Sequence, residues 1–199
     1  MDSITISNSY ILLFVGVVIL FVLYLWYARI IVKNNQVNEA LGDVDVQLKM
    51  RLDLIPNILT IANKFMEHEK ELMTSITQLR TKSESDYDKT NNAEITDHLA
   101  VANELTDKMS QLKIAVENYP TLKSDQTMLN AMQSYNEVES QIAASRRFYN
   151  SAVSSLNTSI QIFPGTILGK VAHVSEYPFF KVEANANTAI DANSFFNQK

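Results

Sequence analysis

One stretch of this sequence is too long and too uniformly apolar for an ordinary helix of a water-exposed protein. No charged side chain occurs between Tyr10 and Ala28, and thirteen residues from Ile11 to Leu25 are Leu, Ile, Val or Phe. A helix of this length measures about 28 Å, close to the hydrocarbon thickness of a bilayer. Each of these apolar residues favours membrane insertion, by about 0.3 to 0.6 kcal/mol. The sequence therefore predicts a single transmembrane helix over residues 10–28.

Residues suited to a membrane–water interface flank this helix. Aromatic rings stand at both ends and basic residues only at its C-terminal end; the set is Tyr10, Tyr24, Trp26, Tyr27, Arg29 and Lys33. Because Lys and Arg are enriched on the cytoplasmic side of a span, we expect residues 1–9 to be a short extracytoplasmic N-terminus. The C-terminal part of the chain is then expected in the cytoplasm.

Two other interpretations of the apolar stretch fit less well. A cleaved signal peptide has a basic start, a shorter apolar core and a small-residue cleavage site, which residues 1–33 do not offer. A core helix that is apolar on every face needs a large surrounding protein. The rest of this chain is patterned as polar helices instead.

The composition disfavours several classes of function. A formal net charge of −5 argues against a nucleic-acid partner, which requires a basic surface. The absence of cysteine excludes thiol catalysis, disulfides and Cys-ligated metals. Four glycines in 199 residues leave little material for phosphate-binding loops or nucleophile elbows. We therefore expect no enzyme activity, no cofactor, no metal site and no small-molecule substrate.

Helical periodicity dominates the chain after the span. Apolar residues recur in steps of three and four over residues 34–81, 92–118 and 124–163. The inner face of the first helix is expected to comprise Val37, Leu41, Val44, Leu48, Leu52, Ile55, Leu59, Ala62 and Met66. That of the third is expected to comprise Leu129, Met132, Tyr135, Val138, Ile142, Tyr149, Val153, Leu156, Ile160 and Phe163. Ser124 or Asp125 is placed to cap the third helix.

These patterns predict an all-α fold. The transmembrane helix is expected to continue into an elongated antiparallel bundle of three long helices plus a short C-terminal segment, resembling a four-helix bundle. The bundle is expected over residues 29–183, and residues 184–199 are expected to form a mobile tail. A brief fourth helix is expected within residues 167–174, followed by extended chain over 177–182.

Pro56 is the one interruption within the first helix. Proline removes a backbone donor and crowds the carbonyl four residues earlier, which predicts a kink or break near residues 51–54. If the first helix is continuous to residue 81, Pro120 lies level with Pro56 along the rod. The apolar stripe near residues 34–55 then needs cover from the C-terminal segment or from another copy of the chain.

Two motifs in this sequence resemble those of the LemA family. The first is Gln47-Leu-Lys-Met-Arg51-Leu-Asp53-Leu-Ile-Pro56-Asn57, followed by His68-Glu69. The second is Arg146-Arg147-Phe-Tyr149-Asn150, followed by Asn157 and then Phe163-Pro164. Met50 stands where the family usually has a basic residue, and Leu156 where it has tyrosine. The resemblance implies a bacterial single-pass membrane protein with a helical bundle, placed in the inner membrane, and it implies no agreed activity.

The polar residues of these motifs fall beside the inner faces of the helices. The structural or interaction set is Gln47, Arg51, Asp53, Pro56, Asn57, Arg146, Arg147, Tyr149, Asn150 and Asn157. Buried polar groups need partners, and such pairs often fix the register between helices. The set therefore either locks helix register or forms a polar patch that docks a partner.

Specific chemistry finds little support in the residue spacing. Glu67, His68 and Glu69 are adjacent and point to different faces of a helix, so they lack the Glu-x-x-His spacing of carboxylate metal sites in bundles. His68-Glu69 resembles the start of a phosphoacceptor helix, but the chain has no glycine-rich nucleotide-binding region. A solvated charged face explains this segment more simply.

Three functional hypotheses follow from the sequence. The first is a non-enzymatic, membrane-anchored scaffold that binds other membrane or envelope proteins or copies of itself. The second is a regulatory partner of an envelope enzyme such as a membrane protease, and the third is a phosphoacceptor or metal-binding bundle. The aromatic residues Phe179, Phe180, Phe195 and Phe196 either cover a bundle end or meet the bilayer or another subunit.

Overall fold

A computed structural model describes the backbone of residues 2–181 and the side chains of residues 10–181. Residues 2–181 form helices and connecting segments, and no strand is assigned among them. The helices are α1 (Asp2–Ala62), α2 (Lys70–Ser83), α3 (Asn92–Val116), α4 (Pro120–Lys123), α5 (Gln126–Gln161) and α6 (Gly165–Val171). The prediction of an all-α fold is thereby confirmed. The expected mobile tail over residues 184–199, with Phe195 and Phe196, lies outside the described residues.

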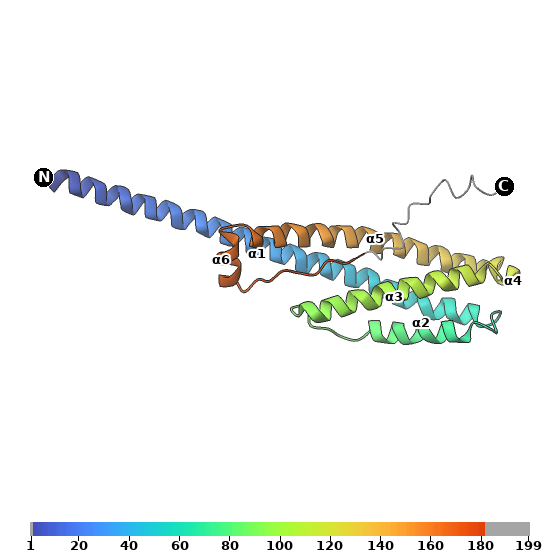
Figure 1. Ribbon diagram of the computed structural model, residues 1–199. Helices are drawn as coiled ribbons and strands as arrows, with labels where there is room; N and C mark the ends of the chain where they lie inside the picture. Colours follow the sequence, from blue (N-terminus) through green and yellow to red (C-terminus); the bar gives the residue numbers. More distant parts are fainter. Residues whose placement is uncertain (1, 182–199) are drawn as a thin grey trace, which may run out of the picture.

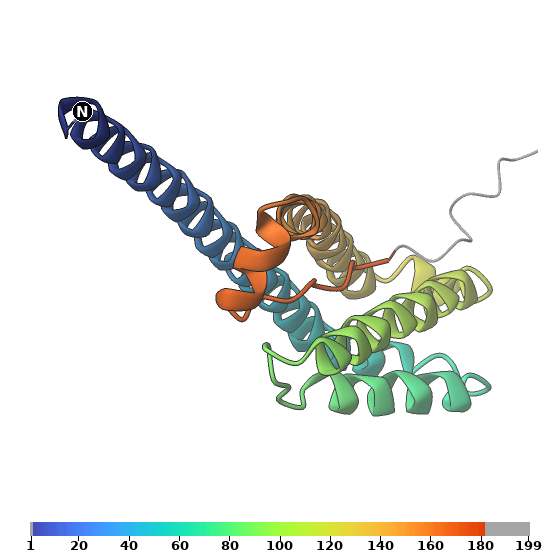
Figure 2. The ribbon, with the colours of Figure 1, turned by 60° about the vertical axis from the view of Figure 1, so that its left-hand side comes forward.

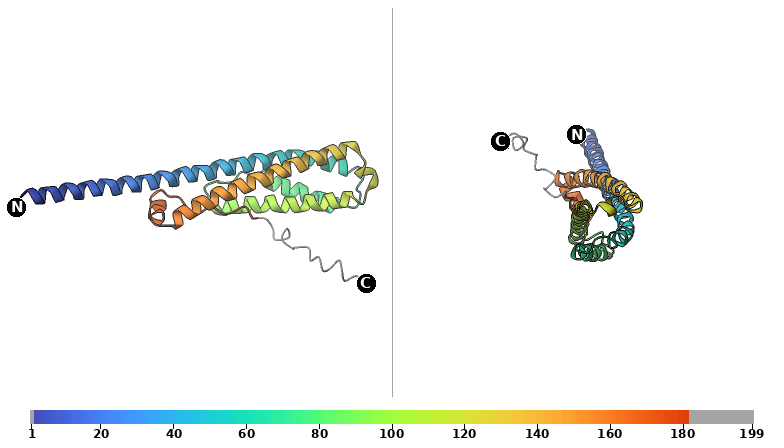
Figure 3. Two further views of the ribbon diagram at one scale, coloured as in Figure 1. Left: turned by 90° about the horizontal axis from the view of Figure 1, so that it is seen from above. Right: turned by 90° about the vertical axis from the view of Figure 1, so that its right-hand side faces the viewer.

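The longest helix, α1, continues without a break from the apolar stretch into the helical body. It has 61 residues, which corresponds to about 90 Å of helix. Its N-terminal part projects alone from the body, as Figures 1 and 3 show. The most apolar window of this part has a mean hydropathy of 2.7 and no buried residue. The helix is therefore long and apolar enough to span a membrane, as the sequence predicts.

Pro56 does not break α1, so of the two expectations near residues 51–54, a kink or a break, the break is wrong. The helix continues for six more residues and ends at Ala62. Proline has no N–H to donate to the carbonyl of Leu52, four residues earlier. Arg80 of α2 supplies the missing donor, since its Nε lies 3.1 Å from the Leu52 oxygen. A side chain from the neighbouring helix thus satisfies the backbone group that Pro56 leaves free.

The chain instead reverses direction between residues 63 and 69, so the single helix expected over residues 34–81 is two helices. α2 returns along the body, α3 runs back towards the far end, and α5 returns to the membrane-proximal end (Figures 1 and 3). The body therefore contains four long helical segments where three were expected. α4, which begins at Pro120, lies at the far end of the rod near the end of α1 (Figures 1 and 3), and its Leu122 belongs to the same apolar cluster as Ile55, the neighbour of Pro56.

The core consists of two apolar clusters along the rod. The distal cluster joins the last part of α1 to α2, α4, the second half of α3 and the start of α5. The proximal cluster joins residues 30–48 of α1 to the start of α3, the second half of α5 and Phe180. α1 contributes to both clusters. It is therefore the element that connects the apolar stretch to the whole body.

The apolar stripe expected to be uncovered near residues 34–55 is in fact buried. Val37, Leu41 and Val44 have no solvent exposure, because α5, α3 and the C-terminal residues cover them. The expected cover by the C-terminal segment is thus observed for this part of α1. The argument for self-association from an open stripe is wrong.

The sequence located the inner face of α5 less well than that of α1. Leu129 and Phe163 were expected to point inward, but they are exposed at 48% and 74%. Met128 and Ala131 are buried in their place. The cap of α5 is as expected, since the Asp125 side chain accepts a hydrogen bond from the Met128 backbone N–H at 2.9 Å. After α6, residues 174–181 run as extended chain without strand pairing.

Candidate functional site

Arg51 is the most deeply buried charged residue of the body, with 1% of its surface exposed. Its guanidinium lies between three helices. Nη1 donates to Thr106 Oγ1 at 2.7 Å and to Glu139 Oε1 at 3.2 Å, and Nη2 donates to the Ala102 carbonyl at 3.1 Å. A buried cation without partners would be strongly destabilising. These contacts from α3 and α5 therefore fix where α1 sits between them.

Arg146 extends this polar layer from α5 towards the end of the described chain. Its Nη2 donates to Asn103 Oδ1 at 3.2 Å, and its guanidinium lies 4.1 Å from the centroid of the Phe180 ring. This distance is within the range of a cation–π interaction. Burial lowers the pKa of Arg146 from its ordinary value. Arg146 thus joins α5, α3 and the C-terminal segment, which we define as residues 172–181.

Two asparagines of α5 bind the backbone of the C-terminal segment. Asn157 donates to the Tyr177 carbonyl and accepts from the Tyr177 N–H, both at 3.0 Å. Asn150 does the same for Phe180, at 3.0 Å to its carbonyl and 2.8 Å from its N–H. Each side-chain amide therefore pairs with one residue in the way that a neighbouring strand would.

The spacing of these pairs follows from simple geometry. Asn150 and Asn157 are seven residues apart, which is about 10.5 Å along a helix. Tyr177 and Phe180 are three residues apart, which is about 10 Å along extended chain. Helix and extended chain therefore stay in register over both pairs, with the C-terminal segment antiparallel to α5. Two polar side chains about two helical turns apart therefore bind two points of one extended segment.

Further contacts tie the C-terminal segment to three helices. The Tyr149 hydroxyl donates to the Pro178 carbonyl at 2.8 Å, and Asn103 of α3 donates to the Lys181 carbonyl at 3.1 Å. The Tyr177 hydroxyl donates to Asn38 Oδ1 of α1 at 3.0 Å. Burial raises the pKa of the Tyr149 hydroxyl. The segment thus closes the proximal core through its backbone as well as through buried Phe180.

The structure brings together only part of the residue set expected from the motifs. Arg51, Arg146, Tyr149, Asn150 and Asn157 belong to the layer just described. Asp53, Pro56, Asn57 and Arg147 are exposed, and Gln47 is half-buried on α1. Arg51 makes the contacts between helices that the register interpretation requires. The two asparagines instead fix the C-terminal segment, a role that the sequence interpretation did not include.

The residues expected at the membrane interface lie along α1 where it leaves the body. Tyr10 and Tyr24 are exposed at 69% and 64%. Trp26 and Tyr27 are half-buried and Arg29 is exposed. Lys33 points to α5, where its Nζ donates to the Ser155 carbonyl and the Ser159 hydroxyl. The end of α5 therefore lies beside the end of the apolar stretch.

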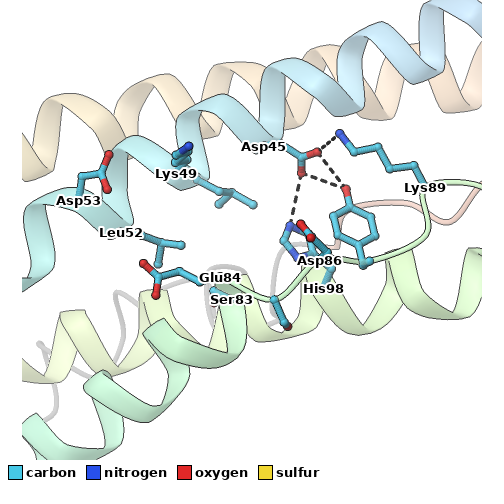
Figure 4. Close-up of a pocket in the computed structure, with 12 residues that line it drawn as sticks. Asp45, Lys49, Leu52, Asp53, Ser83, Glu84, Asp86, Lys89 and His98 are labelled. Carbon is cyan, nitrogen blue, oxygen red and sulfur yellow. Dashed lines mark hydrogen bonds and ion pairs between the residues drawn. The ribbon is translucent and has the colours of Figure 1, made fainter.

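A second polar site lies between α1 and the loop that joins α2 to α3. We call it the side groove; it has a volume of about 310 Å³. Its lining is Asp45, Leu48, Lys49, Leu52, Asp53, Ser83, Glu84, Ser85, Asp86, Tyr87, Lys89 and His98. Figure 4 shows that Lys89, Tyr87 and His98 point towards Asp45, whereas Lys49, Asp53 and Glu84 do not.

Three side chains contact the Asp45 carboxylate. The Tyr87 hydroxyl donates to both of its oxygens, at 3.0 and 3.1 Å, and Lys89 forms an ion pair with Oδ2. His98 Nε2 lies 3.4 Å from Oδ1, and the His98 ring stacks on Tyr87 with centroids 4.1 Å apart. Burial alone raises the pKa of Asp45, but His98, Lys89 and Tyr87 together lower it below its ordinary value. Burial and the charge of Asp45 raise the pKa of Tyr87.

The side groove lacks a recognisable catalytic arrangement among the described residues. Ser83 and Ser85 line it, but Ser85 donates to the Lys82 carbonyl, and no serine hydroxyl bonds to His98 in residues 10–181. A nucleophile requires such a base within hydrogen-bond reach. Over the same residues, no three His, Asp or Glu side chains are placed to share a metal ion.

Sequence reasoning missed several residues of these sites. Glu139 and Thr106, the partners of Arg51, look like surface residues of amphipathic helices. Asp45 and His98 each adjoin a buried apolar position, Val44 and Leu99, and only that adjacency hinted at a half-buried location. Tyr87 falls between the helices expected over residues 34–81 and 92–118, among turn-forming residues, and nothing in its sequence surroundings marks it as part of a site. The roles of these residues depend on which helices pack together. The apolar pattern of one helix does not contain that information.

Comparison with known proteins identifies relatives of the body. The model of a family described as the LemA family matches residues 40–193, more than half of the chain. Magnetosome protein MamQ 1 and magnetosome protein MamQ 2, both of Paramagnetospirillum magneticum strain AMB-1, are each 30% identical to this chain over 90 residues. That alignment covers 45% of this chain and 33% of each relative. The similarity to these two proteins thus concerns about a third of their length.

The first prediction concerns the asparagine pairs. Asn157→Ala removes two hydrogen bonds to Tyr177, and at about 0.5 to 1.5 kcal/mol each this lowers the free energy of unfolding by about 1 to 3 kcal/mol. Hydrogen exchange of the Tyr177 amide should accelerate at least tenfold. The control Asn130→Ala, at an exposed position of the same helix, should leave that exchange rate unchanged. Unchanged exchange at Tyr177 in Asn157→Ala would show that the pairing does not hold the segment.

The second prediction concerns Asp45. Because its folded-state pKa is lowered, its stabilisation is complete above the unfolded pKa of about 3.9 and is lost as the pH falls through the lower folded value. At pH 7, Asp45→Asn should therefore lower the free energy of unfolding by about 1.5 to 3 kcal/mol. The difference from the parent protein should shrink below about pH 4. Urea unfolding in micelles, followed by circular dichroism, measures both effects.

The matched control for this experiment is Asp53→Asn. Asp53 lines the same groove but is exposed, so its substitution should change the free energy of unfolding by less than about 0.5 kcal/mol. Equal losses in the two variants, or a difference that does not begin to shrink as the pH falls below about 4, would contradict the role assigned to Asp45.

Proposed function

The chain belongs to the LemA family, and from that premise we propose that it is a single-pass, membrane-anchored scaffold that binds other proteins and carries out no chemistry itself. One observation carries the proposal. The apolar part of α1 stands fully outside the body, and the same helix continues through both core clusters. A membrane anchor that is joined to the body by an unbroken helix holds the body at a fixed place beside a bilayer.

The proposed site is the inner membrane of a bacterial cell, with the N-terminus outside and the body in the cytoplasm. The support for this orientation is the charge distribution along α1. Arg29 and Lys33 follow the apolar stretch directly, and no basic residue precedes it. Such a bias places the basic end of a span in the cytoplasm.

The side groove is the proposed partner-binding surface of the body. Asp53, Glu84 and Asp86 are exposed at its edge. Lys89 is already paired with Asp45 and Glu84 with Arg80, and Lys49 is a further exposed cation of the lining. An edge with this charge favours a basic segment of a partner protein. The proposed partners are membrane or envelope proteins, with neither nucleic acid nor a small-molecule substrate among them.

A regulatory role towards an envelope enzyme, such as a membrane protease, is the alternative within the same class. The groove would then hold a segment of that enzyme, and co-purification of the two proteins would depend on the groove residues. Self-association is a further version of the scaffold. The apolar stripe of α1 faces the body and does not support self-association. The exposed Val46 and Met50, on the outer side of α1, are the surface that we propose for it.

A phosphoacceptor or metal-binding role is the least supported. His68 lies in the turn between α1 and α2, exposed and beside Glu67 and Glu69. Nothing in the arrangement of the described residues orients it towards a second reacting group.

Labelling of single cysteines in intact cells tests the proposed function, because the chain has no cysteine of its own. We expect Ser3→Cys to react with a membrane-impermeant maleimide in intact cells. We expect Asp86→Cys, in the side groove, to react only after the cells are permeabilised. A photoactivatable cross-linker on Asp86→Cys should then join the chain to a second polypeptide, whereas one on Asn130→Cys, on exposed α5, should not.

Three outcomes would contradict the proposed function. Labelling of Asp86→Cys in intact cells would reverse the orientation. Recovery of the full-length chain in a detergent-free soluble fraction would remove the anchor. Absence of a cross-linked partner at every exposed body position tested would contradict the scaffold.

A further inference from the structure

The membrane-proximal end of the body carries an apolar face that no described residue covers. Ile162, Phe163, Ile167 and Val171 are exposed at 55%, 74%, 58% and 63%. Ile167 and Val171 are four residues apart on α6, which places them on one side of that helix, and Ile162 and Phe163 lie in the turn before it. We call these four residues the α6 face. Side chains of this size are rarely exposed together on a soluble surface without an interaction to explain them.

The opposite side of α6 is fixed against α5. Gly165 and Gly169 are buried there, and a Cβ atom at Gly165 would overlap the Ser159 carbonyl oxygen. At Gly169 an added Cβ would lie 3.1 Å from Ile160 Cγ2. Two glycines thus allow α6 to lie directly on the last turn of α5. The larger apolar residues of α6 are left to point away from the body.

The position of the α6 face along α1 is set by contacts at the end of α5. Trp26, Arg29, Ile30 and Lys33 enclose a small cavity of about 240 Å³ together with Thr158, Ser159 and Ile162. Ile162 is thus level with the aromatic and basic residues that end the apolar stretch. In a membrane those residues lie at the head groups. The α6 face therefore lies at the same depth.

The figures show that α6 lies at the end of the body from which the projecting part of α1 emerges. In Figure 2, where the membrane-proximal side comes forward, α6 is the foremost element of the body. In Figure 3, α6 is at the end of the body from which α1 emerges. Its axis lies across the direction of α1 in Figure 1, which is parallel to the plane of a bilayer that α1 crosses.

The charges around the α6 face suit a lipid surface. Lys170 is exposed on α6 and Arg29 is exposed on α1. Glu176 is the acidic residue that follows on the C-terminal segment, and its carboxylate accepts a hydrogen bond from Gln161. Basic residues beside an apolar helix face are typical of helices that lie in the head-group region of anionic membranes.

We propose that the α6 face rests in the head-group region of the bilayer that α1 spans, as a second membrane contact of the same chain. This inference rests on the proposed membrane anchoring. It adds that the body does not stand free above the membrane. With α1 and the α6 face both in the bilayer, rotation of the body about the axis of α1 is restricted and the side groove keeps a fixed height above the lipid.

Depth-dependent fluorescence quenching tests this inference on the full-length chain. We would label Ile167→Cys and Val171→Cys with bimane in nanodiscs of phosphatidylcholine with a minor share of phosphatidylglycerol. Lipids with a doxyl quencher near the head group should quench both labels several-fold more than a label on Ile114→Cys. Ile114 is an equally exposed apolar residue, at 70%, on the distal part of α3. All three positions are exposed, so the labels leave the core intact.

A label on Val18→Cys tests the membrane anchor separately from the second membrane contact. It should be quenched by lipids that carry the doxyl group deep in the acyl chain. Quenching at Val18 without quenching at Ile167 and Val171 would overturn the second contact and leave the anchor intact. No quenching at Val18 would overturn the anchor itself. Cross-linking of Ile167→Cys between two copies, with no lipid quenching, would show that a second chain covers the face and would also overturn the inference.

Discussion

The unbroken helix α1 is the constraint on which the rest of the structure depends. A segment in lipid must satisfy its backbone hydrogen bonds internally, and a helix does so without help. Here the same helix continues for more than thirty residues into the body and lines both core clusters. At Pro56, where a backbone bond is lost, Arg80 donates to the freed carbonyl. The position of every other helix relative to the membrane then follows from how it packs on α1.

The polar residues of the body mostly fix positions in this arrangement. Arg51 places α1 between α3 and α5, and Asn150 and Asn157 hold the C-terminal segment against α5. Such groups add little net stability compared with well-packed apolar residues, but removing one partner leaves another buried and unpaired. The side groove differs, because its acidic edge is exposed while Asp45 is held by three neighbours. It is the surface that we propose as the binding site for a partner protein.

Much of the fold could be predicted from the sequence, because hydrophobic length and periodicity report on local structure. The span, the all-α class, the inner face of the first helix and the Asp125 cap are examples. The end of α1 could not be predicted. The apolar period continues through Met66, and residues 63–69, where the chain reverses, include no Gly or Pro that would mark a turn. The effect of Pro56 depends on Arg80, which is distant in sequence. The pairing of Asn150 and Asn157 with the C-terminal segment depends equally on a contact between distant residues, so the motif pointed to the residues and not to their role.

The distance from the apolar part of α1 to its part in the body tests this account most directly. Spin labels at Val18→Cys and Val46→Cys of the full chain in nanodiscs are 28 residues apart, which is about 42 Å along a continuous helix. Pulsed electron resonance should give a single narrow distribution near that value. A broad distribution, or one centred well below it, would show a hinge between the membrane segment and the body and would contradict the continuous helix.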